Sequence, residues 1–144
     1  MQHHGLATRL LDFTTNPLIA IFFATDPRVE ADGELISARY RWSYESMEDA
    51  TLFDGDHEFA YLPPHITDRI IGQQGCFAYS KVPNREFAGK SIRRIKIPEK
   101  SKIDMRRELQ ALGITHSLLF PGIDGLSKDL NESLELAISL EDMF

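Results

Sequence analysis

QHHGLATRLLDFTTN, residues 2–16, is followed without a break by PLIAIFFA, residues 17–24. The first run concentrates imidazole, guanidinium, carboxylate and hydroxyl groups, and the second is apolar on every side. Asn16 is a favourable N-cap and Pro17 suits the first helical position, so we expect a buried helix over residues 17–25. A helix N-terminus presents unpaired N–H groups and a partial positive charge. The polar run therefore predicts a pocket for an anion or a polar ligand at the start of this helix.

The rest of the chain predicts an α+β fold, a small, mostly antiparallel sheet flanked by helices, in a single domain over residues 1–144. Alternation and β-favouring residues indicate four strands, at residues 34–42, 58–62, 76–81 and 91–97. A helix is expected over residues 101–112, opened by a capping box of Ser101 and Asp104 and ended at Gly113. Residues 114–120 fit either a strand or a short helix. A final helix over residues 126–140 carries a clear apolar stripe.

Composition limits the classes of function. The net charge is −6, which argues against a general nucleic-acid binder. The eight basic residues between Lys90 and Arg107 are opposed by two acids, so this segment is either a solvated face or a local basic surface for phosphates. A single cysteine, Cys76, excludes an internal disulfide and fits a reducing compartment. Without a bilayer-length apolar run or a secretion signal, we expect a cytoplasmic protein with no membrane partner.

The opening motif resembles the FRG domain family of bacteria and phages. That family reads Gln-His-aromatic-Gly-Leu-Pro-Thr-Arg-Leu-Leu-Asp-Trp-Thr, then Asn-Pro and a helix that ends in Phe-Ala. The chain departs from this pattern at His4, Ala7 and Phe13. It matches at the following residues: Gln2, His3, Gly5, Leu6, Thr8, Arg9, Leu10, Leu11, Asp12, Thr14, Asn16, Pro17, Phe23 and Ala24.

Two later segments, residues 69–77 and 119–126, also look like this family. The Phe-Arg-Gly motif that names the family normally lies upstream and does not occur in the chain. We therefore expect a truncated or shortened member. The resemblance implies a toxin or effector in bacterial or phage conflict.

The chain is also similar, more distantly, to ADP-ribosyltransferases. Their Ser/Thr-rich element before a helix ending in Phe-Ala resembles residues 14–24, and their late Gln/Glu-x-Glu element falls near residues 73–75. This similarity implies a nucleotide ligand of the NAD type, as substrate, with no cofactor required. His3, Arg9 and Gln74 would then be catalytic and Asp12 would brace Arg9. The expected ligand-binding residues are Gln2, Thr14, Thr15, Asn16 and Gln73.

Several alternatives stay open at this point. Arg9 and Asp12 also fit a purely architectural ion pair, and residues 73–75 a polar turn. A glutamine cannot stabilise an oxocarbenium-like centre by charge, so the domain could bind a nucleotide without reacting. The competing class is a non-catalytic module that binds a protein or a nucleic acid through the Lys90–Arg107 surface. A metal-free ribonuclease using His3 and Arg9 is a further alternative. No metal site is expected, because the histidines and Cys76 lack ligand spacing.

Overall fold

The computed structural model describes residues 10–39, 42–43, 59–63, 67–79 and 92–141. Its elements include six strands and five α-helices, and a short 3-10 turn (Glu99–Ser101) precedes α3. In chain order they are β1 (Leu10–Thr14), α1 (Pro17–Ala24), β2 (Gly33–Ser37), β3 (Trp42–Ser43), β4 (Phe59–Tyr61), α2 (Asp68–Gly72), β5 (Gly75–Tyr79), β6 (Arg93–Ile97), α3 (Lys102–Ala111), α4 (His116–Leu119) and α5 (Ile123–Glu141).

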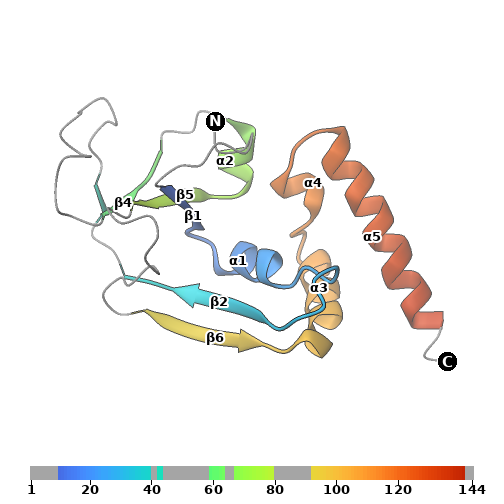
Figure 1. The fold of residues 1–144 in the computed structure, drawn as a ribbon. Coiled ribbons are helices and arrows are strands. Elements are labelled where there is room, and N and C mark those ends of the chain that lie inside the picture. Colours follow the sequence, from blue (N-terminus) through green and yellow to red (C-terminus); the bar gives the residue numbers. More distant parts are fainter. Residues whose placement is uncertain (1–9, 40–41, 44–58, 64–66, 80–91, 142–144) are drawn as a thin grey trace.

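The strands form two sheets, and the predicted α+β class is confirmed. One sheet has the order β1-β5-β4-β3, in which only β3 and β4 run parallel, and β2 pairs with β6 as an antiparallel ribbon. Helix α1 contacts both β1 and β2, and it lies between the two sheets (Figure 1). The prediction of one sheet was therefore wrong, and so was the prediction of one strand over residues 34–42. The strand ends at Ser37, and Trp42 pairs instead with Ala60 of β4.

The core lies where α1 meets α3 and α4. Ile19 and Phe22 of α1 pack with Leu109 and Leu119, and all four side chains are almost fully buried. Helix α1 was expected to be buried on every side, but Phe23 is 48% exposed. The expectation of burial on every side was therefore wrong.

The structure around α3 confirms only part of what the sequence predicted. The capping box was wrong, because Ser101 has helical backbone angles and its side chain makes no capping hydrogen bond. Asp104 pairs with Arg107 instead, at 3.2 Å. Gly113 ends the helix as predicted, with φ of +79°, a conformation that side-chain-bearing residues rarely adopt. Within residues 114–120, the structure has a short helix, α4 (His116–Leu119), and no strand.

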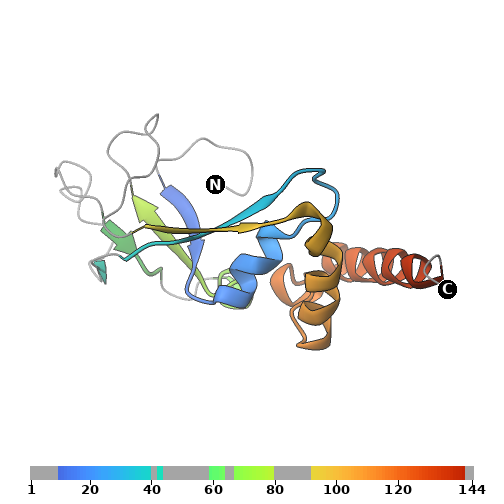
Figure 2. The same cartoon turned by 90° about the horizontal axis from the view of Figure 1, so that it is seen from below.

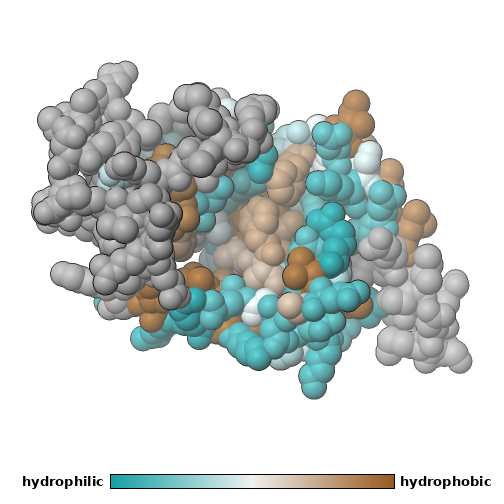
Figure 3. Space-filling view, viewed as in Figure 1, coloured by the Kyte–Doolittle hydropathy of each residue, from teal (hydrophilic) through white to brown (hydrophobic). Residues whose placement is uncertain are grey.

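Helix α5 begins three residues earlier than expected and carries its apolar stripe toward solvent. Leu126, Leu130 and Leu134 are each more than half exposed, and hydrophobic residues are visible along this helix (Figure 3). Figures 1 and 2 both place α5 at the end of the molecule opposite the four-stranded sheet. Among the helices that the structure describes, none combines the length and the apolar character needed to cross a bilayer.

Candidate functional site

The junction of β1 and α1 is held by hydrogen bonds from its hydroxyl and amide side chains. Asn16 caps α1, because its Oδ1 atom accepts the Leu18 N–H at 2.9 Å. The Thr14 hydroxyl accepts the Asn16 N–H at 3.1 Å and donates to the Gln73 carbonyl at 2.8 Å. This network fixes the start of the helix and ties it to a segment 59 residues further along the chain.

That segment is the turn between α2 and β5. Gln73 ends α2, and Gln74 adopts a positive φ of 44°, which turns the chain sharply into β5. The Thr15 N–H donates to the Gln74 carbonyl at 3.1 Å, directly beside the Thr14 bond. The Gln73 side chain donates from Nε2 to the Leu119 carbonyl at 3.0 Å. The turn thus joins the start of α1 to the end of α4.

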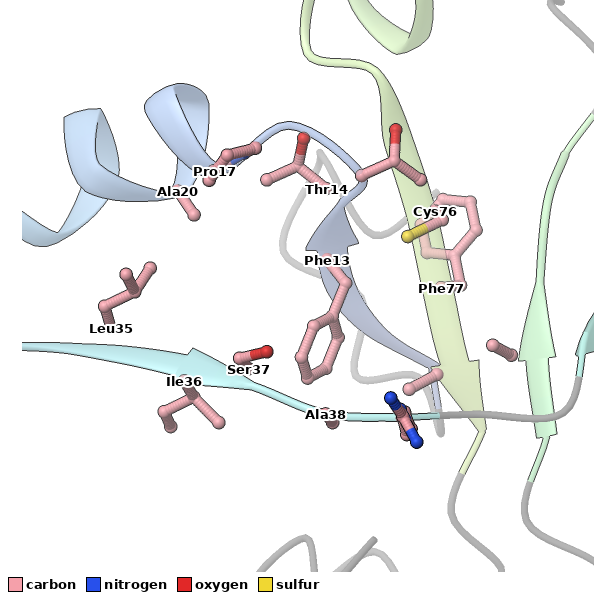
Figure 4. Close-up of a pocket in the computed structure, with 14 residues that line it drawn as sticks. Phe13, Thr14, Pro17, Ala20, Leu35, Ile36, Ser37, Ala38, Cys76 and Phe77 are labelled. Atoms are coloured by element: carbon pink, nitrogen blue, oxygen red, sulfur yellow. The ribbon is translucent and has the colours of Figure 1, made fainter. Parts of the chain in front are cut away.

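A cavity of about 440 Å³ opens beside this junction. We call it the α1 cavity. Figure 4 shows the Phe13 ring extending from β1 toward β2, and Leu35 extending from β2 toward Ala20 on α1. Thr15 and Arg39 are polar residues in the same lining. The cavity therefore has largely apolar walls with hydroxyl and guanidinium groups among them.

A second cavity, of about 470 Å³, adjoins the first and is called the Gln73 cavity. Both are lined by Phe13, Ala20 and Leu35, so one apolar wall serves the two spaces. The Gln73 cavity has more charged residues in its lining, namely Asp12, Glu34 and Arg69. Glu34 is paired with Arg94 across the β2–β6 ribbon at 2.6 Å.

Cys76 lines the α1 cavity but is unsuited to nucleophilic chemistry. It is 5% exposed, and burial raises the pKa of its thiol to about 11. A thiol with this pKa is almost entirely protonated at neutral pH, and the thiolate is the reactive form. Cys76 therefore contributes to packing at this site.

The segments that meet here are the ones whose motifs resemble a known family. Residues 1–33 match the FRG domain. The match confirms the predicted FRG resemblance over this stretch, while the FRG-like segments at 69–77 and 119–126 lie outside it. No curated protein and no solved structure matches the chain, and nothing in these comparisons supports the similarity to ADP-ribosyltransferases.

The three FRG-like segments nevertheless lie together in space. The second segment contacts the first through the Thr14–Gln73 bond. It contacts the third through the bond from Gln73 to Leu119, and the Arg69 guanidinium lies over the Phe120 ring at 4.8 Å from its centroid. The sequence resemblance thus corresponds to one continuous region around the Gln73 turn.

The predicted site residues divide into two groups. Gln2, His3 and Arg9 lie outside the described residues. Thr14, Thr15, Asn16, Gln73 and Gln74 gather at the helix mouth, while Asp12 lies two residues away on β1 and lines the Gln73 cavity.

Several of these groups already have partners within the protein. The Thr14 and Thr15 hydroxyls lie 2.8 and 3.4 Å from turn carbonyls, and the Gln73 amide nitrogen bonds to Leu119. Gln74 is exposed at its turn and lines neither cavity. Residues 73–75 therefore have the structure of a polar turn.

The expected Lys90–Arg107 surface is interrupted. Lys102 and Arg106 are 3% and 4% exposed. The Lys102 ammonium donates to the Asp26 and Val29 carbonyls, at 3.2 and 2.9 Å. Neither a solvated face nor a phosphate-binding surface fits these two residues, because their long side chains reach inward to carbonyls of α1 and of the loop after it.

Further cations of this segment are paired with acids. Arg94 pairs with Glu34, Lys96 with Asp32 at 2.6 Å, and Arg107 with Asp104. Lys90 lies outside the described residues. The described part of the segment therefore offers a patchwork of ion pairs, and not a continuous basic surface.

Arg106 and Arg69 are the residues that sequence reasoning missed. Arg106 occurs in a run of eight basic residues, and only its place on the Leu109 face of α3 could have marked it as buried. Arg69 is the first residue of the FRG-like segment at residues 69–77, and the sequence assigned it no role. Its position just before Gly72 and the two glutamines of the turn was the sequence feature that could have marked Arg69 as a site residue.

Besides Arg106, the titratable side chain of His116 lies near the end of α1. Its ring meets Phe22 edge-on, with centroids 4.9 Å apart, and its Nε2 atom lies 3.4 Å from the Glu132 carboxylate. Burial lowers the pKa of His116, and the nearby Arg106 charge acts in the same direction. Within the described ranges, no three metal-binding side chains gather closely enough to hold an ion.

Proposed function

We propose that this chain is an FRG-like domain that binds a nucleotide of the NAD type in the α1 cavity and the adjoining Gln73 cavity. The observation that carries the proposal is the pair of cavities at the mouth of α1, of about 440 and 470 Å³. Both volumes fall in the range of small-molecule sites, which are roughly 300–1,000 Å³. Because they share a wall, they suit a ligand with two linked parts.

The lining chemistry supports this class of ligand. A planar base packs favourably against an aromatic ring, and Phe13 with Leu35 supplies such a wall. Thr15 and Arg39 lie beside it, and a guanidinium binds phosphate oxygens in a bidentate manner. The carboxylates of Asp12 and Glu34 are suited to accepting hydrogen bonds from ribose hydroxyls.

The proposed role as an ADP-ribosyltransferase-like toxin or effector rests on the resemblance alone. In it, His3 and Arg9 would contact the nucleotide, and Gln74 would be the catalytic candidate of the turn. The alternative module that binds through the Lys90–Arg107 surface is less favoured, because Lys102 and Arg106 are buried.

Thermal unfolding with added nucleotides tests the binding proposal. A ligand that binds only the folded state adds about 2.7 kcal/mol at a hundred times its Kd. We expect NAD to raise the unfolding midpoint in a saturable way. Failure of NAD, ADP-ribose and ATP to move the midpoint would refute the proposal, and RNA binding with a steep salt dependence would favour the alternative.

A matched pair of variants places the ligand. Ala38 lines the α1 cavity and is half-buried, so Ala38→Trp fills the space and abolishes the NAD shift. Ala31 is exposed and lines neither cavity, so Ala31→Trp keeps the shift. Release of nicotinamide from NAD, measured with the same variants and with Gln74→Ala, then tests the reaction separately from binding.

A further inference from the structure

We propose a second ligand site, for a phosphate-bearing anion, in a cavity of about 450 Å³ between α2 and the start of α5. We call it the Arg69 cavity. It is lined by Arg69 of α2, Phe120 and Pro121 of the connection after α4, and Asp124, Gly125 and Lys128 of α5. This site does not depend on the proposed nucleotide function.

Two cations converge on one aromatic ring in this cavity. The Arg69 guanidinium lies 4.8 Å from the Phe120 ring centroid, and the Lys128 ammonium lies 5.5 Å from it. Each contact is a favourable cation–π interaction, but the two like charges repel one another. An anion bound between them removes that repulsion.

Neither cation has an acidic partner among the described residues. Arg94, Lys96, Arg106 and Arg107 each pair with a carboxylate, whereas neither Arg69 nor Lys128 has one within ion-pair distance. The Nε atom of Arg69 is moreover buried and makes no hydrogen bond to the described part of the chain. A buried N–H without an acceptor is rare, so the contacts of Arg69 with the described residues do not satisfy its guanidinium.

The chemistry of these groups points to phosphate. A guanidinium presents parallel N–H donors that match two oxygens of a phosphate, and an ammonium adds a point charge. Asp124 lines the same cavity and opposes an anion, so the lining holds two positive charges against one negative charge. Phosphate or pyrophosphate fits this balance better than a neutral ligand.

Arg69 also lines the Gln73 cavity, so the two sites share one side chain. The anion is therefore either a free phosphate or the phosphate part of a nucleotide that reaches across Arg69. Both sources present the same oxygens to Arg69 and Lys128. Inorganic pyrophosphate and ADP, titrated separately, distinguish them.

The test follows the unfolding midpoint of the full chain during titration with inorganic pyrophosphate at constant ionic strength, with sodium chloride as the comparison. We expect the unfolding midpoint to rise in a saturable way with pyrophosphate and not with sodium chloride. Arg69→Gln and Lys128→Gln should each weaken binding by roughly tenfold, the loss typical of one charge-assisted contact. Lys100→Gln, at an exposed lysine that does not line the cavity, should leave it unchanged.

Asp124→Asn is a variant whose expected effect on pyrophosphate affinity is opposite to that of Arg69→Gln and Lys128→Gln. Removal of that carboxylate should tighten pyrophosphate binding, a result that general destabilisation does not produce. Asp124 and Lys128 are both exposed, so these two variants keep the test valid even if Arg69→Gln fails to fold.

Two results would overturn the site. One is a rise of the unfolding midpoint with pyrophosphate that is no larger than the rise with chloride. The other is an effect that Ala38→Trp abolishes while Lys128→Gln and Asp124→Asn leave it intact, since the anion would then bind in the α1 cavity. A shift that survives Ala38→Trp and falls in Lys128→Gln supports a site distinct from the one proposed for NAD.

Discussion

Replacing Arg106 by methionine should destabilise the protein far more than its place in a charged segment implies. Its Nε and Nη2 atoms donate to the Thr25 and Phe22 carbonyls at 3.1 and 2.7 Å, and its Nη1 atom lies 3.3 Å from Glu132. The guanidinium also lies 3.6 Å from the Phe22 ring centroid. Methionine fills similar space but leaves the two carbonyls without this donor and removes the positive charge beside the Glu132 carboxylate.

Removing one member of a buried ion pair typically costs about 3–5 kcal/mol. Domains of this size unfold with about 5–15 kcal/mol, so the loss is a large share of the total. The midpoint should fall by roughly 10 °C. Thermal and urea unfolding, followed by circular dichroism, measure both quantities.

The matched control is Lys100→Met, at an exposed cation six residues earlier in the same segment. Substitutions of this kind usually stay within about 0.5 kcal/mol. Arg106→Lys should fall between the two, because it keeps the charge but loses the forked donors. Equal unfolding free energies for Arg106→Met and Lys100→Met would refute the inward role of Arg106.

Three further predictions concern the helix ends and His116. Asn16→Ala should lower the unfolding free energy by about 1 kcal/mol, the usual cost of an N-cap that accepts a helix N–H, and an unchanged urea midpoint would contradict the capping bond. Gly72→Ala should cost roughly 1–3 kcal/mol in thermal unfolding, because the new Cβ would lie 2.3 Å from the Leu118 carbonyl oxygen; a stable variant would show that α2 and α4 are less closely packed. Burial lowers the pKa of His116, so its contribution to stability is present above pH 6.5 and is lost as the pH falls through the folded-state pKa. His116→Gln should therefore flatten that part of a stability profile measured from pH 8 to pH 5, and two parallel profiles would disprove the assignment.

Local sequence patterns correctly predicted helix ends where a strong capping or helix-ending residue is present. Asn16-Pro17 set the start of α1, and Gly113 set the end of α3. The failures arose where tertiary contacts override a local pattern. Ser101 could not act as a cap because a preceding 3-10 turn had already placed it in helical geometry. The division into two sheets depends on the long-range pairing of β2 with β6, which no local pattern encodes.

The candidate site shows the same division. Residues 14–16 and the turn at 73–75 were assigned to one ligand site, and hydrogen bonds from Thr14 and Thr15 join these two segments. The carbonyl partners of Lys102 and Arg106 were not predictable, because they belong to α1 and the loop after it, far away in the sequence. Contact with a ligand stays a prediction for all of the candidate site residues, including Gln2, His3 and Arg9.

The β2–β6 ribbon forms the wall of both proposed nucleotide cavities through Leu35 and Ile36. A two-stranded ribbon has little stability of its own, so the rest of the molecule must hold this wall in place. Its amide protons should exchange with deuterium sooner than those of β5, which has a neighbour on each side. Slower exchange at residues 33–37 and 93–97 is thus the signature that an occupant of these cavities would leave.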